Sequence, residues 1–220
     1  EAWLYEAGFD ATYGWGVAET VLGIVQGEKS AADLQRKLEA EFELHRAHPG
    51  GFRIHFTTNH DWNTWHGLAT ERLGEAWELA SVLSFLAPGM PLIYGGQEAG
   101  LEAQLEFFER DPIAWRRHAH GAFLRALTSL KADSDVLQAP LIERDVRFTP
   151  AGVMPEGVLV LGQQDEFETL LLVMNLTPER VELPDPGPAP DALTDLWGYP
   201  TALPEALDGW GWHLTRFRGE

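Results

Sequence analysis

The stretch Phe56-Thr-Thr-Asn-His-Asp-Trp62 decides the fold, because an apolar run typical of a strand ends there in a polar turn. A helix-length segment follows, and a second apolar run, Leu92-Ile-Tyr94, then opens into Gly95-Gly-Gln-Glu98. Barrel enzymes keep their sites on polar groups just beyond the C-terminal ends of successive parallel strands. The order of strand, polar turn, helix and strand therefore predicts a parallel α/β sheet with functional residues at this turn.

Strand and helix signals alternate through the first part of the chain. Ser30 followed by Asp33 predicts a helix start, since the hydroxyl can cap the first turn and the acidic residue can stabilise it. Asp111-Pro112 predicts another, with proline at the first position of a helix that ends near Lys131 and turns inward Trp115, Ala119, Phe123, Leu127 and Leu130. The other elements expected here are helices over about 17–26 and 68–86 and strands over 52–58 and 92–94.

The pattern changes to β-type from Val136 onward. Apolar runs over 158–161 and 169–174 predict a hairpin, and alternation over 210–217 predicts a closing strand. Periodicity alone does not distinguish a barrel from an open sheet in the first part. The sequence therefore predicts a parallel sheet with an appended all-β module, divided into residues 1–135 and 136–220.

The chain is strongly acidic, with a net charge of −18 from 34 acidic and 16 basic residues. We expect no nucleic-acid partner, because binding phosphates requires clustered Lys and Arg. No apolar run reaches about 18 residues, so no membrane partner is expected either. The absence of cysteine excludes disulfides and thiolate metal sites but leaves the compartment undecided. Because the first residue is Glu1 rather than Met, we expect the true N-terminus to lie elsewhere.

Four segments, in their order along the chain, resemble the alpha-amylase family of glycoside hydrolases, family 13. They are similar to the family's sixth strand, its seventh-strand motif, its eighth strand and loop, and the segment that leads into its eighth helix. A fifth segment is similar to the strand ending in Asn in the family's C-terminal β-sandwich. In chain order the five segments are Phe9–Tyr13, Thr57–Asp61, Pro88–Glu98, Phe107–Trp115 and Leu171–Leu176.

The resemblance implies a partial (β/α)8 (TIM) barrel, its last three strand–helix units lying in residues 1–135, followed by an antiparallel β-sandwich in residues 136–220. A complete barrel takes about 250 residues, and an open three-stranded sheet leaves its edges exposed. The remainder of the barrel, upstream or on another chain, is therefore an expected partner. The implied substrate is an α-glucan or oligosaccharide, and the implied reaction is hydrolysis or transfer at an α-glucosidic linkage with retention.

The family works with three carboxylates, and this chain holds at most two of them. Retaining glycosidases use a nucleophile and an acid/base carboxylate about 5–5.5 Å apart. The family's nucleophile lies in a Gly-x-Arg-x-Asp motif, whereas the nearest string here, Gly51-Phe-Arg-Ile-His55, ends in His. We therefore expect this chain alone to be inactive. Glu1, followed by Ala2 and Trp3, matches the family's acid/base position; the alternative is an ordinary exposed glutamate.

Asp61 corresponds by its motif to the family's third carboxylate, which binds hydroxyls of the sugar at the cleavage site. A charged acceptor makes stronger hydrogen bonds than a neutral one, and bonds to the 2-hydroxyl that tighten in the transition state contribute to the rate. His60 would donate to a neighbouring hydroxyl. The alternatives are a helix N-cap for Asp61 and a satisfied polar loop residue for His60.

Four further residues complete the predicted substrate-binding set. Asn59 either supports the loop or contacts sugar, and Trp62 either stacks on sugar or packs in the core. Asp10 and Tyr13 would reach the floor of the cleft. We expect no metal site, because no two histidines share a face at ligand spacing. Cofactors stay undetermined, since family members that bind calcium do so mostly through residues upstream of this region.

A different class of function is also open. Some relatives of the family have lost their catalytic residues and act as non-catalytic carbohydrate-binding or accessory proteins. A free-standing carbohydrate-binding β-module would explain only the residues after about Leu141. A Gly-x-Arg-x-Asp motif upstream of Glu1 would favour the enzyme, and its absence would favour the binding protein.

Overall fold

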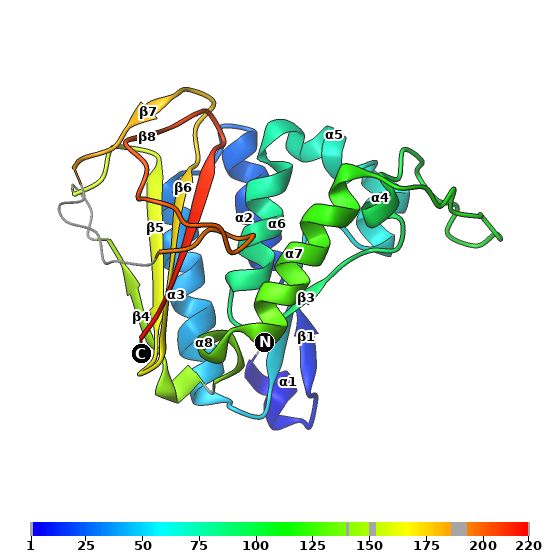
Figure 1. The fold of residues 1–220 in the computed structure, drawn as a ribbon. Helices are drawn as coiled ribbons and strands as arrows, with labels where there is room; N and C mark the ends of the chain where they lie inside the picture. The colour runs from blue at the N-terminus through cyan, green and yellow to red at the C-terminus, as the bar shows by residue number, and fades with distance from the viewer. Residues whose placement is uncertain (1, 140, 150–152, 186–192, 220) are drawn as a thin grey trace.

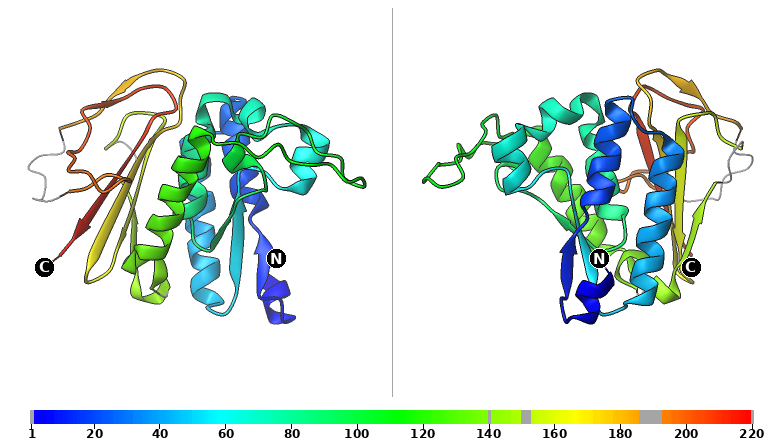
Figure 2. Two further views of the ribbon diagram at one scale, coloured as in Figure 1. Left: turned by 45° about the vertical axis from the view of Figure 1, so that its right-hand side comes forward. Right: turned by 180° about the vertical axis from the view of Figure 1, so that it is seen from behind.

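The computed structural model describes residues 2–139, 141–149, 153–185 and 193–219, which are arranged in three layers. A parallel sheet and an antiparallel sheet form the outer layers, and helices lie between them (Figure 1, Figure 2). The fold is therefore mixed α/β with an added antiparallel sheet, as the sequence predicts.

The parallel sheet contains three strands in the order β1 (Ala11–Tyr13), β2 (Phe52–Phe56) and β3 (Met90–Leu92). Its register pairs Ala11 with Phe52 and Ile54 with Met90. Parallel strands need crossover connections, and helices provide both of them. After the short helix α1 (Ala2–Glu6), the helices are α2 (Trp15–Val25) and α3 (Ala31–Ala47) before β2, and α4 (His60–His66), α5 (Ala69–Leu73) and α6 (Trp77–Leu86) before β3.

The helix start predicted at Ser30 is confirmed. The Ser30 hydroxyl accepts a hydrogen bond from the backbone N–H of Asp33, and the Asp33 carboxylate accepts one from the Ser30 N–H at 2.8 Å. This reciprocal pair satisfies two N–H groups that have no partner within the helix. The helix α3 then buries Leu34, Leu38 and Phe42, each at most 1% exposed.

Two helix predictions need correction. The helix expected over 68–86 is divided at Gly74, whose φ of 53° lies in the left-handed region, and a short 3-10 turn separates α5 from α6. The helix expected from Asp111-Pro112 begins later than predicted, as α7 (Ala119–Asp133), which buries Phe123, Leu127 and Leu130 as expected and is followed by α8 (Asp135–Gln138). None of the helices in the described ranges has the length and apolar character needed to cross a bilayer.

Residues 101–118 form a loop without helix or strand. The Asp111 carboxylate accepts a hydrogen bond from the backbone N–H of Glu106, five residues earlier, at 3.1 Å. The carboxylate therefore stabilises a turn and does not cap a helix. Trp115, which the helix prediction placed in the core, is 64% exposed. Local capping signals were therefore overridden by a turn that the same side chain stabilises.

The antiparallel sheet confirms the predicted hairpin and closing strand. Its strand order is β4-β5-β6-β9, with β5 and β6 adjacent in the chain and β9 paired to β6. A separate two-stranded sheet, β7 with β8, lies beside it. The bounds are β4 (Asp145–Phe148), β5 (Val158–Gln164), β6 (Glu168–Asn175), β7 (Val181–Glu182), β8 (Ala206–Leu207) and β9 (Trp212–Arg218).

One hydrophobic core joins the helices to the antiparallel sheet. Strand side chains alternate between faces, so Leu161 and Leu172 pack on the helical layer, together with Leu127 of α7. On the opposite face, Val160 packs against Leu207 of β8. This shared core fixes the antiparallel sheet against the helices that support the parallel sheet.

Candidate active site

Asn59, His60 and Asp61 lie directly beyond the carboxyl end of β2, the central strand of the parallel sheet. Asn59 is 1% exposed and caps α4, because its Oδ1 accepts a hydrogen bond from the backbone N–H of Trp62 at 2.9 Å. Asn is well suited to this position, since its side chain satisfies an N–H that the helix leaves unpaired. Asn59 therefore supports the turn, and a direct sugar contact by Asn59 stays a prediction.

The side chains of His60 and Asp61 face solvent next to each other. Their exposed fractions are 49% and 44%, and Nε2 of His60 lies 3.6 Å from Oδ1 of Asp61. The capping role that the sequence also allowed for Asp61 is taken by Asn59. Among the described residues, His60 is the only basic side chain within 4.0 Å of the Asp61 carboxylate. The carboxylate is thus placed to accept hydrogen bonds from a ligand.

An exposed aromatic cluster adjoins His60. The ring of Phe107 lies 5.8 Å from the ring of His60 and 5.8 Å from that of Trp65, and Phe108 extends the cluster. Trp65 is 58% exposed and Phe108 is 83% exposed. Exposed ring faces beside hydrogen-bonding groups suit a ligand that has both apolar and polar surface. Sequence reasoning assigned no role to Phe107 or Phe108, and their place in a family-like segment was the available signal.

The helix α4 holds this aromatic loop in place. Oδ1 of Asn63 accepts a hydrogen bond from the backbone N–H of Leu105 at 2.8 Å, and the Thr64 hydroxyl donates to the Leu105 carbonyl at 3.0 Å. Asn63 is only 1% exposed, so this contact is shielded from water. The same short helix that carries Asp61 therefore also positions Phe107.

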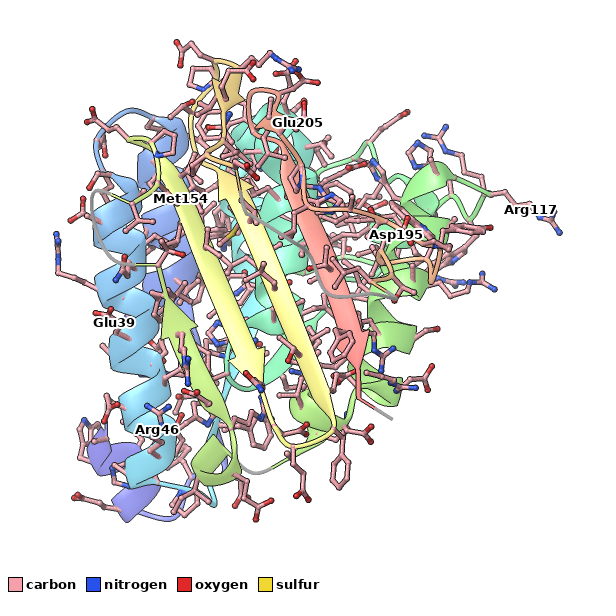
Figure 3. All side chains as sticks on the ribbon, turned by 60° about the vertical axis from the view of Figure 1, so that its left-hand side comes forward. Glu39, Arg46, Arg117, Met154, Asp195 and Glu205 are labelled. Atoms are coloured by element: carbon pink, nitrogen blue, oxygen red, sulfur yellow. The ribbon has the colours of Figure 1, made fainter. Side chains whose placement is uncertain are left out.

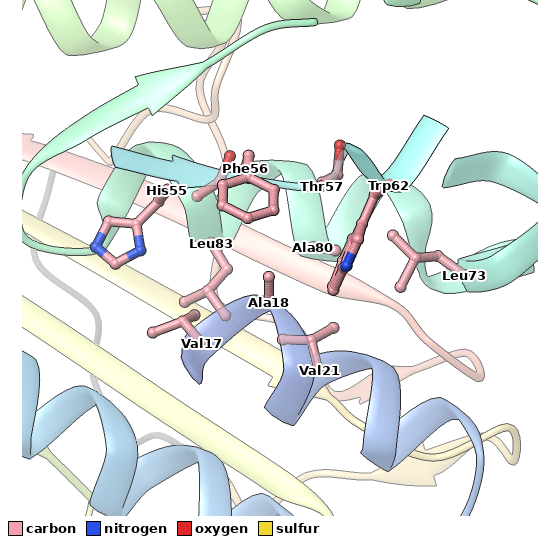
Figure 4. Close-up of a pocket in the computed structure, with 11 residues that line it drawn as sticks. Val17, Ala18, Val21, His55, Phe56, Thr57, Trp62, Leu73, Ala80 and Leu83 are labelled. Atoms are coloured by element: carbon pink, nitrogen blue, oxygen red, sulfur yellow. The ribbon is translucent and has the colours of Figure 1, made fainter. Parts of the chain in front are cut away.

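Trp62 lies beneath the turn in a buried aromatic cluster. It is 9% exposed, and its ring centroid is 5.5 Å from that of Phe56 and 5.7 Å from that of Trp15. Tyr13, at the end of β1, packs on the same cluster, 5.7 Å from Phe56. The pocket under Trp62 in Figure 4 has a volume of about 10 Å³, which holds one water at most. These contacts are packing contacts, and sugar binding by Trp62 or Tyr13 stays a prediction.

Comparisons with known proteins find alpha-amylases. No family model matches the chain. The curated Alpha-amylase MalA of Haloarcula japonica is 28% identical over 84% of this chain. An alpha-amylase from Lactobacillus plantarum matches 99% of the chain with a TM-score of 0.69 and 22% identity. The resemblance to the alpha-amylase family is confirmed.

A second solved alpha-amylase, that of Geobacillus thermoleovorans complexed with acarbose, matches 100% of the chain with a TM-score of 0.69 and 19% identity. The chain spans 50% of each of these two solved alpha-amylases and 26% of MalA. The likeness to the solved alpha-amylases concerns the fold.

The alpha-amylase resemblance also assigned roles to Asp10 and Glu1. Asp10 is exposed and precedes β1, whereas Asp61 follows the end of β2; because Ala11 pairs with Phe52, the two carboxylates lie at opposite ends of the sheet. The structure therefore does not bring Asp10 to the alpha-amylase-like turn. Glu1 lies outside the described residues. Within the part of the chain that the structure describes, no three His, Cys, Asp or Glu side chains are grouped to hold a metal ion.

The alpha-amylase-like loop after β3 is tied to the end of β2. Gln97 accepts a hydrogen bond from the backbone N–H of Tyr94 and donates one to the Thr57 hydroxyl, both at 2.8 Å. The Glu98 carboxylate accepts one from the backbone N–H of Gly96 at 2.9 Å. Gln97 and Glu98 therefore fix the loop through its backbone N–H groups and through the Thr57 side chain.

Arg72 was not identified from the sequence, although it lies directly behind the site. Its guanidinium stacks on Trp62 at 4.3 Å and donates to the Thr57 carbonyl at 3.3 Å and the Thr58 hydroxyl at 3.2 Å. Burial lowers the pKa of Arg72 to about 10, so the side chain is a cation at neutral pH. Its Nε and Nη1 are buried and meet no acceptor among the described residues, nor does Nδ2 of Asn59 meet one.

Proposed function

We propose that this chain forms the second half of the catalytic barrel of a retaining hydrolase or transglycosylase for α-glucosidic linkages. In this proposal residues 1–135 supply the last three strand–helix units of a (β/α)8 barrel, and residues 136–220 form its C-terminal β-sandwich domain. The proposal rests on the position of the Asp61 carboxylate, which is exposed beyond the central parallel strand. Asn59 caps α4, so the Asp61 carboxylate is not needed for capping.

The unpaired donors behind the site support an incomplete barrel. Buried polar groups are nearly always hydrogen-bonded, yet Nε and Nη1 of Arg72 and Nδ2 of Asn59 meet no acceptor in the described ranges. Both residues lie at the carboxyl end of the sheet, where upstream barrel strands would bring further polar side chains. We assign those missing acceptors to the upstream half of the barrel.

Asp61 and His60 bind the sugar at the cleavage site in this proposal. The Asp61 carboxylate accepts hydrogen bonds from sugar hydroxyls, and these bonds strengthen as the ring flattens toward an oxocarbenium ion. His60, 3.6 Å from Asp61, donates to an adjacent hydroxyl. The exposed rings of Trp65 and Phe107 beside His60 offer apolar faces to the same ligand.

The two carboxylates that make and break the glycosidic bond lie elsewhere in this scheme. Glu1 acts as the acid/base, and the nucleophile comes from a Gly-x-Arg-x-Asp motif upstream of this chain. The chain alone therefore does not hydrolyse glycosides. Acarbose, the compound found with the Geobacillus alpha-amylase, is a suitable ligand for probing the assembled site.

The experiment that tests the proposal is hydrolysis of maltoheptaose by the full-length protein that contains this chain, followed by proton NMR. We expect the α-anomer of the product to form first, because two displacements at the anomeric carbon retain its configuration. Cellohexaose, with β-linkages, serves as the control and should not be cleaved. Initial formation of the β-anomer would contradict retention. An inactive protein that still binds maltoheptaose would instead assign the chain to the non-catalytic carbohydrate-binding class.

A further inference from the structure

A cavity of about 430 Å³ opens where the antiparallel sheet meets the start of α6. Glu75 and Glu78 line it from the helical layer, and Asp195 and His213 line it from the sheet. Figure 3 shows Asp195 beside β9 of the antiparallel sheet, whereas Asp61 lies on α4, beyond the end of the parallel strand β2. The cavity therefore belongs to a different region of the molecule from the candidate active site.

Three tryptophans line this cavity: Trp197, Trp210 and Trp212. The rings of Trp197 and Trp212 lie 6.3 Å apart and are inclined by 37°. Trp212 is braced from behind by Phe123 of α7 at 5.9 Å, whereas Trp197 is 55% exposed. Two neighbouring indole faces, one fixed and one open to water, form an apolar platform at the rim.

Trp210 has a strained backbone. Its φ of 56° is the only positive value at a non-glycine residue in the described ranges, and side chains rarely adopt this conformation. Glycines flank it for steric reasons: a Cβ on Gly209 would lie 2.0 Å from the Pro178 carbonyl oxygen, and one on Gly211 would lie 2.7 Å from that of Asp208. Strain of this kind concentrates at ligand-binding positions, where the surrounding structure holds it.

Hydrogen-bond acceptors are arranged around the aromatic platform. Oδ1 of Asp195 accepts from the backbone N–H groups of Trp197 and Tyr199 at 2.8 and 2.9 Å, which fixes the carboxylate. His213 also lines the cavity, and its Nε2 is buried and meets no hydrogen-bond partner in the described part of the chain. Burial lowers the pKa of His213, so the imidazole is neutral near pH 7 and adds no positive charge to the lining.

We propose that this cavity is a second saccharide-binding site, one that takes neutral hexopyranose units independently of the site at Asp61. A pyranose ring has an apolar face that stacks on indole and a rim of hydroxyls that donate to the carboxylates of Asp195, Glu75 and Glu78. Anionic ligands do not fit, because the lining holds carboxylates and no Lys or Arg. The volume lies in the range of small-molecule sites.

The test uses 5-fluorotryptophan labelling of the full-length protein that contains this chain, with fluorine NMR during titration with maltoheptaose. The Asp61→Asn variant slows turnover during the titration, and single Trp→Phe variants assign the resonances. We expect the Trp197 and Trp212 resonances to shift with saccharide concentration, with or without Asp61→Asn. No shift of either resonance up to the solubility limit of maltoheptaose would overturn the proposal.

Trp197→Ala is the matched perturbation. We expect it to weaken the affinity read from the Trp212 resonance about tenfold, because one stacking face is lost. Phe167→Ala removes an aromatic of similar exposure, 59% against 55%, at the far end of the same sheet and should leave the affinity unchanged. Unchanged affinity in Trp197→Ala would refute the site.

The two proposals fail separately. Hydrolysis of maltotriose by the Trp197→Ala protein should equal that of the wild type, because the cavity lies on the other sheet. If the wild-type protein does not hydrolyse saccharides but the Trp197 resonance still shifts, the inference stands and the proposed function falls. If hydrolysis occurs and neither resonance shifts, the proposed function stands and this inference falls.

Discussion

Replacing Glu168 by alanine should strongly destabilise the contact between the antiparallel sheet and the helices. The Glu168 side chain is fully buried on β6, and its carboxylate accepts hydrogen bonds from the Ser134 hydroxyl and from the backbone N–H of Val136 at 3.2 Å. It also pairs with Arg216 and Arg218 of β9. One carboxylate thus connects α8 with two strands of the sheet.

The magnitude follows from the groups left behind. Ser134 and Val136 are 0% exposed, so both lose their acceptor in a place that water does not reach. Each buried unpaired donor costs about 1–3 kcal/mol, or about 2–6 kcal/mol for the two. The arginines add less, because Arg218 is 52% exposed and Arg216 also donates to the Asp133 carbonyl at 2.8 Å. A loss of about 4 kcal/mol corresponds to a fall of roughly 8–16 °C in Tm for a protein of about 150–250 residues, and to a smaller fall in a longer protein.

Thermal unfolding of the full-length protein, followed by circular dichroism, measures this effect. Glu166→Ala is the matched control, because Glu166 is exposed on the same hairpin and its loss should change stability by less than about 0.5 kcal/mol. Equal Tm values for Glu168→Ala and Glu166→Ala would refute the reasoning that this buried carboxylate holds the sheet to the helices.

Two further predictions concern the buried face of β2. Burial lowers the pKa of His55 to about 4, below the value of about 6.5 in the unfolded chain. The neutral His55 ring therefore contributes fully to the free energy of unfolding above about pH 6.5. That contribution, up to about 3 kcal/mol, is lost as the pH falls toward about 4. Urea unfolding from pH 7 to pH 4 should show this loss, and a pH dependence unchanged in His55→Gln would contradict it. Gly14→Ala should lower the free energy of unfolding by about 1–3 kcal/mol through overpacking. The added Cβ would lie 2.6 Å from Nδ1 of His55, and the hydrogen bond between His55 Nε2 and the Pro88 carbonyl holds that ring in place. Urea midpoints measure that cost, and Gly50→Ala, with open space around its Cβ, is the control whose midpoint should stay at the wild-type value.

Local signals in the sequence were sufficient for many elements of the fold. The hydroxyl and carboxylate of Ser30 and Asp33 are three residues apart, and that spacing alone produces the observed capping pair. The hairpin followed from two apolar runs separated by a polar turn, and it forms as β5 and β6. These predictions held because each depends on neighbours within a few residues.

Predictions failed where distant contacts decide the conformation. The conformation of the loop 101–118 is set by hydrogen bonds from Asn63 and Thr64 of α4. These bonds join residues about forty positions apart, so no local pattern in the sequence indicates them. The shared core likewise brings together residues as distant in sequence as Leu127 and Leu172, and no periodicity reveals that they belong to one cluster.

The candidate site shows the same division. The polar turn was found from its position after a strand, but the choice between cap and ligand for Asn59 and Asp61 required the hydrogen bond to Trp62. The position of Arg72 behind the site could not be predicted, because no sequence pattern indicates that this arginine stacks on Trp62. Asp10 was grouped with Asp61 by resemblance, and the register of β1 on β2 separates them.

The most direct test of the central claim is the kcat of the full-length protein on maltoheptaose with Asp61→Asn. The substitution keeps the shape of the side chain and removes its charge, so it should remove several kcal/mol of transition-state stabilisation. We predict a loss of about 10²–10³-fold or more in kcat, while Asp145→Asn, at a surface ion pair on β4, leaves kcat unchanged. An Asp61→Asn protein as active as the wild type would contradict the role of Asp61 in catalysis.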